Sequence, residues 1–416
     1  MVEVFLFPGC RTPFVKVGGH YAKRSALELS SAVTLAMTSW AKPDLLVWGQ
    51  AIPDPTVSNI ARELVFKVGL DPRIPAFSTV LACSTGFMSA IVAAGQIGRG
   101  GTHLVLAGGV ETMSHIPVAL NMRKADEVLA RFRRDRAQAA VWLSSQGTDS
   151  FDLPVDDWAN GQTGRSQGEH TEDTVKHFEI SRTDQDALAL KSHQAAIDAI
   201  DNGFFDDLVI SFDDVDHDTI PRRRTSLDQL GRLQPVFSAD GTLTAGNSSS
   251  AADGAASVWV ADREGIARLG AEPQVRLVDW ELAAMDFREE SEAILMSPAR
   301  AIPRLLARHR LTFSDVASWN IHEAFAAQVI ANVRAASDPT YRKEKAGVVF
   351  DFGTFPWSRL NTHGGSLALG HPCAATGARL LSQATKELTT MPIGTKGIVS
   401  ICADSGQGTV ALLERA

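Results

Sequence analysis

Cys83 is the first residue whose type and position could do chemistry. It lies in "ACSTGFMSA", after a strand-like run and at the start of a Gly/Ala-rich stretch with helical character. A thiol at a helix N-terminus faces the positive end of the helix dipole and free amides, and both favour the thiolate. Because a free thiol has a pKa of about 8.5, a modest shift makes it a nucleophile at neutral pH. The alternative is a buried structural cysteine, the more common role of a single cysteine.

His371 could supply the imidazole that such a thiol needs. It lies in "GGSLALGHPCAATGAR", residues 364–379, where few side chains are bulky, and Pro372 follows it directly. The glycines allow close backbone approach and leave room for a bound ligand, and the proline fixes the local chain. The alternative is a turn histidine, or a core histidine whose hydrogen bonds are satisfied.

Cys402 and His322 add two further groups that can move protons. Cys402 lies in "VSICADSGQG", where a buried strand ends in a Gly-containing loop, and such strand ends are common places for sites in α/β proteins. His322 and Glu323 lie in "NIHEAFAAQ", at the expected junction of a strand and a helix. The alternatives are a buried thiol at Cys402 and helix capping by the acid at Glu323.

The elements around these residues predict an α/β fold. Residues 2–7 and 45–49 have strand character, residues 25–37 carry apolar side chains at helical spacing, and residues 102–109 form a buried-strand pattern. Residues 77–82, "FSTVLA", are expected to be a buried strand that runs into the helix after Cys83. This β-α-β order favours a sheet covered by helices.

The end of the chain repeats features of its beginning. Thr85-Gly86 and Thr376-Gly377 are each followed by a helix-like run and a buried strand that ends in small residues, which suggests a duplicated α/β half. Between about Glu111 and Leu243, charges and turn signals are denser, as in an inserted segment. The expected units are a first half at 1–120, completed by about 243–270, an inserted loop or cover domain at 121–242, and a second half at 271–416.

Composition excludes several classes of protein. The 416 residues carry 40 basic and 48 acidic side chains, so the net charge of −8 gives no reason to expect a nucleic-acid partner. Four cysteines in a chain of this length form neither a disulfide framework nor a zinc-ribbon pattern, and they are expected to be reduced. The N-terminus lacks a signal-peptide pattern, and no apolar run approaches the ~18–20 residues that span a bilayer. We expect a cytoplasmic protein.

The order and spacing of these motifs resemble the thiolases, the cysteine-dependent acyl-CoA transferases. The resemblance covers essentially the whole chain and includes "CRTPFVKVGG" at residues 10–19 and a coenzyme A segment, "TAGNSSSAADGAA", at residues 244–256. His322, "LGHPCAATGAR" and "MSHIPV" resemble most closely the β-subunit branch of the fatty-acid trifunctional enzymes. The resemblance implies duplicated α/β halves in a layered αβαβα arrangement with an inserted loop domain.

The resemblance also implies a role for each candidate residue. Cys83 would accept the acyl group, and His371 would take its proton. Cys402 would be the second acid/base, His322 would hold a water or an oxyanion, and Ser249 would line the path of the pantetheine. A metal site at the same cysteines and histidines is less favoured, because the resemblance gives these residues other roles and a metal site needs dedicated, oriented ligands.

Further residues would support catalysis or bind the substrate. Asp404, whose backbone amide would help to form an oxyanion pocket, stands where relatives mostly carry Gly or Ala, and its carboxylate would oppose a thiolate if it pointed into the site. Glu323 is expected to support the same region. Gln167 and Phe325 are expected to line the acyl pocket, and the arginine triplet 222–224 (Arg222, Arg223 and Arg224) could pair with coenzyme A phosphates.

The implied activity is that of a 3-ketoacyl-CoA thiolase of the fatty-acid β-oxidation type. It would cleave 3-ketoacyl-CoA with free coenzyme A to acetyl-CoA and a shortened acyl-CoA, through an acyl-cysteine, with coenzyme A as substrate and no permanently bound cofactor or metal. The alternatives are a biosynthetic acetyl-CoA acetyltransferase, a ketoacyl-synthase-like condensing enzyme, and a catalytically impaired coenzyme A-binding or scaffold subunit. The expected partners are a second copy, as a homodimer or a dimer of dimers, and a hydratase/dehydrogenase subunit.

Overall fold

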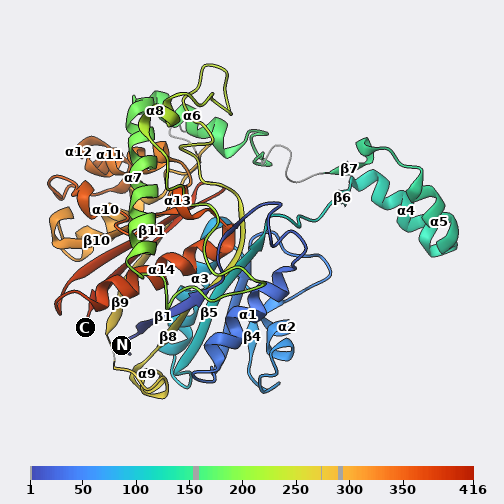
Figure 1. Cartoon of the computed structure of the whole chain (residues 1–416), viewed down its shortest axis with the longest axis horizontal. Coiled ribbons are helices and arrows are strands. Elements are labelled where there is room, and N and C mark those ends of the chain that lie inside the picture. Colours follow the sequence, from blue (N-terminus) through green and yellow to red (C-terminus); the bar gives the residue numbers. More distant parts are fainter. Residues whose placement is uncertain (1, 153–158, 273, 289–293) are drawn as a thin grey trace.

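Strands from the two halves of the chain join in one mixed sheet. In the described residues of the computed structural model, which are 2–152, 159–272, 274–288 and 294–416, this sheet has ten strands (Figure 1). The strands of the first half are β1 (Phe5–Arg11), β2 (Val15–Lys16), β3 (Leu45–Gln50), β4 (Ala76–Phe77), β5 (Leu104–Thr112) and β8 (Ala252–Ala261). Those of the second half are β9 (Val275–Ala284), β10 (Val316–Ile321), β11 (Lys396–Ala403) and β12 (Gln407–Arg415).

The two halves repeat the same pattern of strand pairing. In the first half β1 pairs antiparallel with β8, β8 antiparallel with β5, and β5 parallel with β3. In the second half β9 pairs antiparallel with β12, β12 antiparallel with β11, and β11 parallel with β10. The halves meet where Phe5 and Leu6 of β1 pair with Arg276 and Val275 of β9. The duplication predicted from the sequence is therefore confirmed.

Both faces of each half-sheet are covered, which explains the continuous apolar runs of the strands. Successive side chains of a strand point to opposite faces. In β3, Leu45 and Val47 join a central core, whereas Leu46 and Trp48 join the core on the other face. The central core contains α3 (Thr85–Gly98) and α14 (Cys373–Thr389).

Two further helix pairs complete the layers. Helices α1 (Ala26–Thr38) and α2 (Ile60–Lys67) cover the outer face of the first half-sheet. Helices α10 (Pro298–Arg308) and α11 (Ala326–Ser337) cover the outer face of the second. The order is helix, sheet, helix, sheet, helix, so the predicted αβαβα arrangement is confirmed. Short helices α9 (Arg263–Arg268), α12 (Pro339–Tyr341) and α13 (Ser366–Leu369) lie in the connections.

The two Thr-Gly pairs let α3 and α14 start in direct backbone contact. A Cβ atom added at Gly86 would lie 2.5 Å from the carbonyl oxygen of Ala374, and one added at Gly377 would lie 2.5 Å from the backbone nitrogen of Phe87. Because only glycine permits this approach, the N-terminal ends of the two central helices are held together.

The prediction of a buried strand at residues 77–82 is wrong. Strand β4 ends at Phe77 and pairs only with β3, at the edge of the sheet. Val80 is 61% exposed, and Ala82 has a φ of 43°, which turns the chain into the short 3₁₀ helix at Ala82–Ser84. An apolar edge segment has strand-like composition, but here the turn toward Cys83 ends the pairing early.

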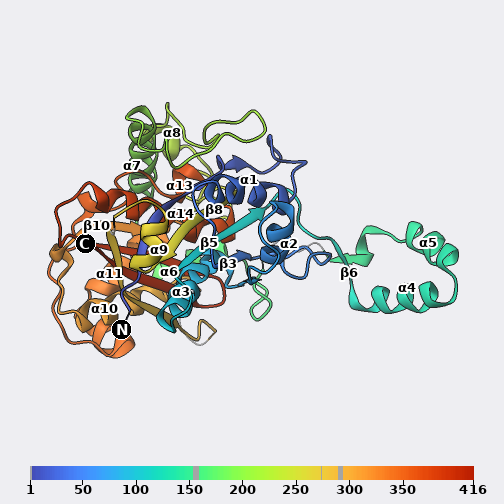
Figure 2. The same cartoon turned by 90° about the horizontal axis from the view of Figure 1, so that it is seen from below.

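The predicted insertion contains two different structures. Residues 119–152, called the arm below, comprise β6 (Ala119–Leu120), α4 (Met122–Arg134), α5 (Arg136–Ser144) and β7 (Phe151–Asp152), and they project away from the body (Figures 1 and 2). Helices α6 (Gln167–His177), α7 (Arg182–Asp201) and α8 (Leu227–Gly231) instead share the core of α10 and α11. Residues 153–158 of the predicted insertion lie outside the described residues, and its limits remain an interpretation. No helix in the described part of the chain combines the length and apolarity needed to cross a membrane.

Candidate active site

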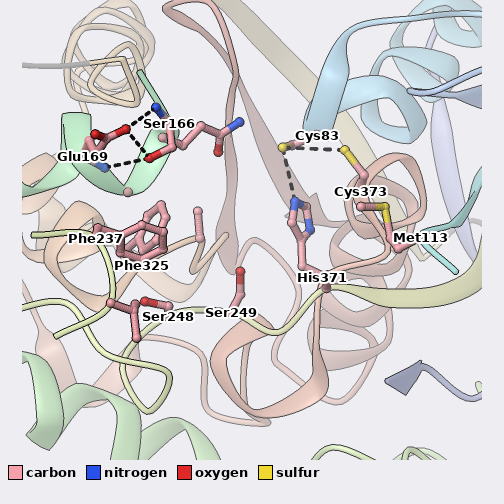
Figure 3. A pocket seen from close by; sticks show the side chains of 15 residues that line it. Cys83, Met113, Ser166, Glu169, Phe237, Ser248, Ser249, Phe325, His371 and Cys373 are labelled. Carbon is pink, nitrogen blue, oxygen red and sulfur yellow. Dashed lines mark hydrogen bonds between the residues drawn. The ribbon is translucent and has the colours of Figure 1, made fainter. Parts of the chain in front are cut away.

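A cavity of about 460 Å³ lies where the two halves and the insertion meet (Figure 3). Cys83 and His371 lie on one side of it, and Phe237 and Phe325 lie across from them. The lining residues are Cys83, Met113, Ser166, Gln167, Gly168, Glu169, Val236, Phe237, Ser248, Ser249, Ala251, Ala324, Phe325, His371 and Cys373. The predicted pocket residues Gln167, Ser249 and Phe325 are therefore all part of its wall.

Cys83 is placed by a strained turn at the start of α3. The non-glycine residue before it, Ala82, has a φ of 43°, in the left-handed region, and such strain is typical of functional turns. The Thr85 hydroxyl group accepts from the amide of Leu81 at 2.8 Å and donates to the carbonyl oxygen of Ala82 at 2.7 Å. Cys83 is buried and lies at the N-terminal end of α3, as the sequence predicts.

His371 faces the sulphur of Cys83. Its Nε2 lies 3.2 Å from Cys83 Sγ, and its Nδ1 lies 2.7 Å from the hydroxyl oxygen of Thr376. The backbone amide of His371 donates to the carbonyl oxygen of Ser250 at 2.8 Å. Gly370, with a φ of +86°, provides the turn before it. The imidazole is thus held at both ring nitrogens, and proton transfer between it and the thiol needs no rearrangement.

His322 also lies close to the sulphur of Cys83. Arg379 Nη2 donates to Ser366 Oγ at 2.9 Å, so the hydroxyl hydrogen of Ser366 is available for Nδ1 of His322, 3.0 Å away. This arrangement leaves the ring proton on Nε2, which makes no hydrogen bond of regular geometry within the described residues but interacts with the sulphur of Cys83 and lowers the pKa of that thiol. Burial, and then the charge of His371, lower the pKa of His322 to about 4, so the ring is neutral at pH 7. A neutral N–H donor is what a developing oxyanion requires.

Cys83, His322 and His371 form a compact group. One sulphur or nitrogen atom from each lies within 4.8 Å of the other two. The pKa of Cys83 lies well below its ordinary value, because a hydrogen bond from Cys373, the charge of His371 and the two imidazoles favour the thiolate against burial. A group of this composition can supply an activated nucleophile, a proton acceptor and an oxyanion donor, and these roles stay a prediction.

The comparisons with known proteins show the family of the chain. Residues 4–264 match the family model "Thiolase, N-terminal domain", and residues 271–415 match "Thiolase, C-terminal domain". The chain belongs to the thiolase family.

Relatives of this thiolase match it from end to end. It is 34% identical to the 3-ketoacyl-CoA thiolase of Shewanella loihica over 428 aligned residues, which cover 99% of this chain and 97% of the relative. Its structure is similar to that of the Bacillus anthracis acetyl-CoA acetyltransferase, with a TM-score of 0.83, 27% identity and coverage of 100% and 99% of the two chains. The human mitochondrial 3-ketoacyl-CoA thiolase gives a TM-score of 0.82, 26% identity and the same coverage.

Cys402 lies near this group but does not line the cavity. It is buried in the core shared with α10 and α11, on the outer face of the second half-sheet. Its pKa is raised well above the ordinary value, chiefly by burial and then by the negative charge of Cys83. Cys402 is therefore protonated at neutral pH in the thiolase, as a proton donor must be, and its role stays a prediction.

Glu323 anchors the segment that leads to His371. Its buried carboxylate accepts from Ser192 Oγ at 2.7 Å, from Asn361 Nδ2 at 2.6 Å and from the amide of Leu367 at 3.1 Å. Burial raises its pKa. The carboxylate does not cap α11, whose N-cap is Phe325. Glu323 instead connects α7 to the chain around α13, which fits the predicted supporting role.

Cys373 is a residue of the site that sequence reasoning did not select. Its Sγ lies 3.8 Å from Cys83 Sγ, and both residues line the cavity. The hydrogen bond to Cys83 and burial raise the pKa of Cys373 well above the ordinary value, so Cys373 is the thiol and Cys83 the thiolate. A thiol two residues after His371, at the start of α14, was the available signal.

Glu111 is a second residue that sequence reasoning missed. Its carboxylate accepts from the amides of Ala51 at 3.0 Å, Ile52 at 3.2 Å and Ala374 at 3.3 Å. Burial is the main cause that raises its pKa to about 7, and the charge of Cys83 adds to the effect. An acid at the end of the apolar strand β5 was the signal. Glu111 connects the start of α14 to the first half of the thiolase.

Asp404 is held beside the site without lining the cavity. Asn160 Nδ2 lies 3.4 and 3.3 Å from its two carboxylate oxygens, and the Ser405 hydroxyl group donates to one of them at 3.2 Å. Its charge contributes to the raised pKa of Cys373, so the carboxylate acts on the site electrostatically. That Asp404 tunes the site rather than acting as a base stays a prediction.

The arginine triplet 222–224 lies on the surface. Arg223 pairs with Asp201 through two contacts of 2.8 and 2.7 Å, and none of the three arginines lines the cavity. The amide of Arg222 donates to Nδ1 of His193 at 3.2 Å. Phosphate binding by the triplet stays a prediction, carried by the exposed Arg222 and Arg224 alone.

Proposed function

We propose that this protein is a 3-ketoacyl-CoA thiolase, an acyltransferase that cleaves 3-ketoacyl-CoA with free coenzyme A. The observation that carries the proposal is the 3.2 Å approach of His371 Nε2 to Cys83 Sγ beside a cavity that can receive a thioester. The family membership and the relatives that carry this name support it.

In the first half of the reaction, His371 holds the proton and the Cys83 thiolate attacks the 3-keto carbon. The Nε2–H group of His322 donates to the oxygen on which negative charge develops, together with the backbone amide of Asp404. The bond between C2 and C3 then breaks, and its electron pair forms the enolate of acetyl-CoA. Cys402 gives its proton to C2, acetyl-CoA leaves, and the shortened acyl group stays on Cys83.

In the second half, a coenzyme A molecule removes the acyl group. Its thiol gives a proton to the Cys402 thiolate, and its sulphur attacks the thioester carbon. The bond from that carbon to Cys83 Sγ breaks, and the electron pair returns to Cys83 as the thiolate. Ser249, in the cavity wall, would lie along the pantetheine, and Gln167 and Phe325 would contact the acyl chain. Coenzyme A is thus a substrate rather than a bound cofactor.

The main experiment combines a steady-state assay with trapping. With free coenzyme A and a 3-ketoacyl-CoA, the protein should release acetyl-CoA; without coenzyme A, a shortened acyl mass should appear on the tryptic peptide 74–99, which holds Cys83. Cys83→Ala should lose both. Cys10→Ala is the matched control and should keep both, because Cys10 lies in the core beside α1. An acyl mass on the peptide of another cysteine, with Cys83 unmodified, would contradict the assignment.

A condensing enzyme of the ketoacyl-synthase kind is the second candidate. The grouping of Cys83, His322 and His371 within 4.8 Å favours it, because this class uses one cysteine and two histidines. Decarboxylation of a malonyl thioester, without cleavage of 3-ketoacyl-CoA, would select it. Binding of coenzyme A without any acyl-Cys83 would select the impaired scaffold subunit, and faster condensation of acetyl-CoA than cleavage would select a biosynthetic acetyltransferase.

We further propose a cytoplasmic protein that pairs with a second copy, as a homodimer or a dimer of dimers. The edge strand β4 and the 61% exposed Val80 that follows it support a contact there, since an unpaired sheet edge favours association. A complex with a hydratase/dehydrogenase subunit follows from the branch resemblance. Sedimentation of the 44.7 kDa chain as a monomer at micromolar concentration would contradict the obligate dimer.

A further inference from the structure

The sulphur of Cys83 has two neighbours in the cavity, and the proposed reaction uses only one. His371 Nε2 lies 3.2 Å from it and Cys373 Sγ lies 3.8 Å from it (Figure 3). Figure 3 shows the two contacts reaching Cys83 from different directions, with Met113 beside Cys373. A sulphur–sulphur distance of 3.8 Å is suitable for a hydrogen bond from a thiol to a thiolate.

The two cysteines are held at this distance by the backbone. Cys83 precedes α3 and Cys373 begins α14, and the starts of these helices touch at Gly86 and Gly377. Glu111 accepts from the amide of Ala374, next to Cys373, and fixes the same helix end. Neither thiol therefore needs to move for the contact to form, and the fold does not let them separate easily.

The surrounding charges decide which sulphur loses its proton. The titratable groups that act on Cys83 or Cys373 from the elements packed around them are His322, His371, Glu111, Cys402 and Asp404. The two imidazoles favour a negative charge on Cys83, whereas Asp404 opposes one on Cys373 and Glu111 opposes one on either sulphur. The proton of the pair consequently stays on Cys373, which makes it the donor.

We propose that Cys373 is a positioning residue whose thiol donates a hydrogen bond to Cys83 and holds it as the thiolate. In the proposed thiolase reaction, on which this role rests, the same bond acts twice. It keeps Cys83 reactive before acylation. It also stabilises the thiolate that leaves when coenzyme A removes the acyl group, because the leaving sulphur again finds a donor.

The direct test measures alkylation of Cys83 by iodoacetamide as a function of pH, which needs no ketoacyl substrate. Each of the four cysteines lies in a separate tryptic peptide, and residues 74–99 and 360–379 hold Cys83 and Cys373. In Cys373→Ala the midpoint of Cys83 alkylation should rise by roughly 0.5–1 pH unit, because one donor to a charged sulphur is lost. In Cys373→Ser a hydroxyl donor remains, so the midpoint should return toward that of the wild type.

Two comparisons make the test decisive. Cys10→Ala, the same truncation at a buried thiol far from the site, should leave the midpoint unchanged. An unchanged midpoint in Cys373→Ala, or an equal rise in Cys373→Ala and Cys373→Ser, would overturn the proposal, since a packing effect alone does not distinguish a donor from a methyl group. If Cys373→Ala shifts the pH midpoint of Cys83 alkylation but the wild type cleaves no 3-ketoacyl-CoA, the hydrogen bond from Cys373 is supported and only the proposed function is rejected.

Discussion

Cys83 in the cavity wall and His322 beside it are buried, whereas α4 of the arm has no buried residue and α5 has only Ala139. In the cavity, glycines bring two helices into backbone contact. In the arm, large apolar side chains such as Met122 and Val141 are 79% and 72% exposed. The difference indicates that the chemistry depends on the junction of the two halves, and that the arm contributes nothing to the cavity of a single chain.

Removal of the imidazole beside Cys83 is expected to have the largest effect on activity. His371→Ala should lower the rate of 3-ketoacyl-CoA cleavage about 10²–10⁴-fold, the range for loss of a general base. Alkylation of Cys83 at neutral pH should slow as well, because the charge and hydrogen bond of His371 lower the pKa of Cys83. Circular dichroism should show an intact fold. Full activity in this variant would contradict the proposed proton acceptor.

Removal of the His322 imidazole should change the pH dependence of the rate less than removal of the His371 imidazole. His322→Ala removes the Nε2–H donor beside Cys83, so cleavage should fall about 10²–10³-fold, as for loss of one oxyanion donor. Because this ring is neutral at pH 7, the pH midpoint of the rate should move less than in His371→Ala. Equal shifts of the midpoint in the two variants would show that both rings exchange protons with Cys83.

Much of this junction was predictable from the sequence. The duplicated Thr-Gly pairs indicated the repeated halves, and the residue types around Cys83 and His371 indicated a thiol and an imidazole that meet. Cys373 was not selected, because its contact depends on the crossing of α3 and α14, and no local pattern encodes the meeting of residues 290 positions apart. The role of Glu111 was hidden for the same reason, since its three donors come from two distant segments.

The surface was less predictable. Dense charge correctly indicates exposure in the segment after Leu120, but the same composition fits a cover over a cavity and a projecting arm. Only the packing of α6, α7 and α8 separates the two parts. Residues 77–82 have the composition of a buried strand, yet an edge position and the turn at Ala82 leave most of them outside the sheet.

The buried acid Glu111 should make the stability of this junction depend on pH. The pKa of Glu111 is about 7 in the folded protein, against 4.5 for the ordinary group, so folding retains its proton. Its contribution is fully present below pH 4.5 and is lost as the pH rises to about 7, at a cost of about 3 kcal/mol in the free energy of unfolding. Glu111→Gln should remove this loss.

Urea unfolding at pH 5 and pH 8 measures the effect. The stability difference between Glu111→Gln and the wild type should move in favour of the variant on going from pH 5 to pH 8. The change with pH is the readout, because the amide also weakens one of the hydrogen bonds to the three backbone amides. A difference that does not vary with pH would show that Glu111 titrates as an ordinary carboxylic acid.

The smallest effect is expected from removal of the arm. Leu120 of β6 pairs with Phe151 of β7 in an antiparallel register, so an Asn-Gly turn can replace residues 121–150 and close the hairpin. Since α4 and α5 bury only Ala139, the free energy of unfolding should stay within about 0.5 kcal/mol of the wild type. The rate of cleavage should also be unchanged, because no residue of the arm lines the cavity.

A matched change in the packed part of the insertion shows that the assay can detect a loss. Leu230 of α8 is 1% exposed and belongs to the core of α10 and α11, so Leu230→Ala should cost about 2–5 kcal/mol. The arm replacement and Leu230→Ala should therefore differ clearly in urea unfolding, although both alter the same insertion. A cleavage rate reduced about tenfold or more in the arm replacement, with unchanged stability, would show that the arm reaches a cavity in the assembled protein. The exposed Met122 and Val141 would then be the first residues to test at that contact.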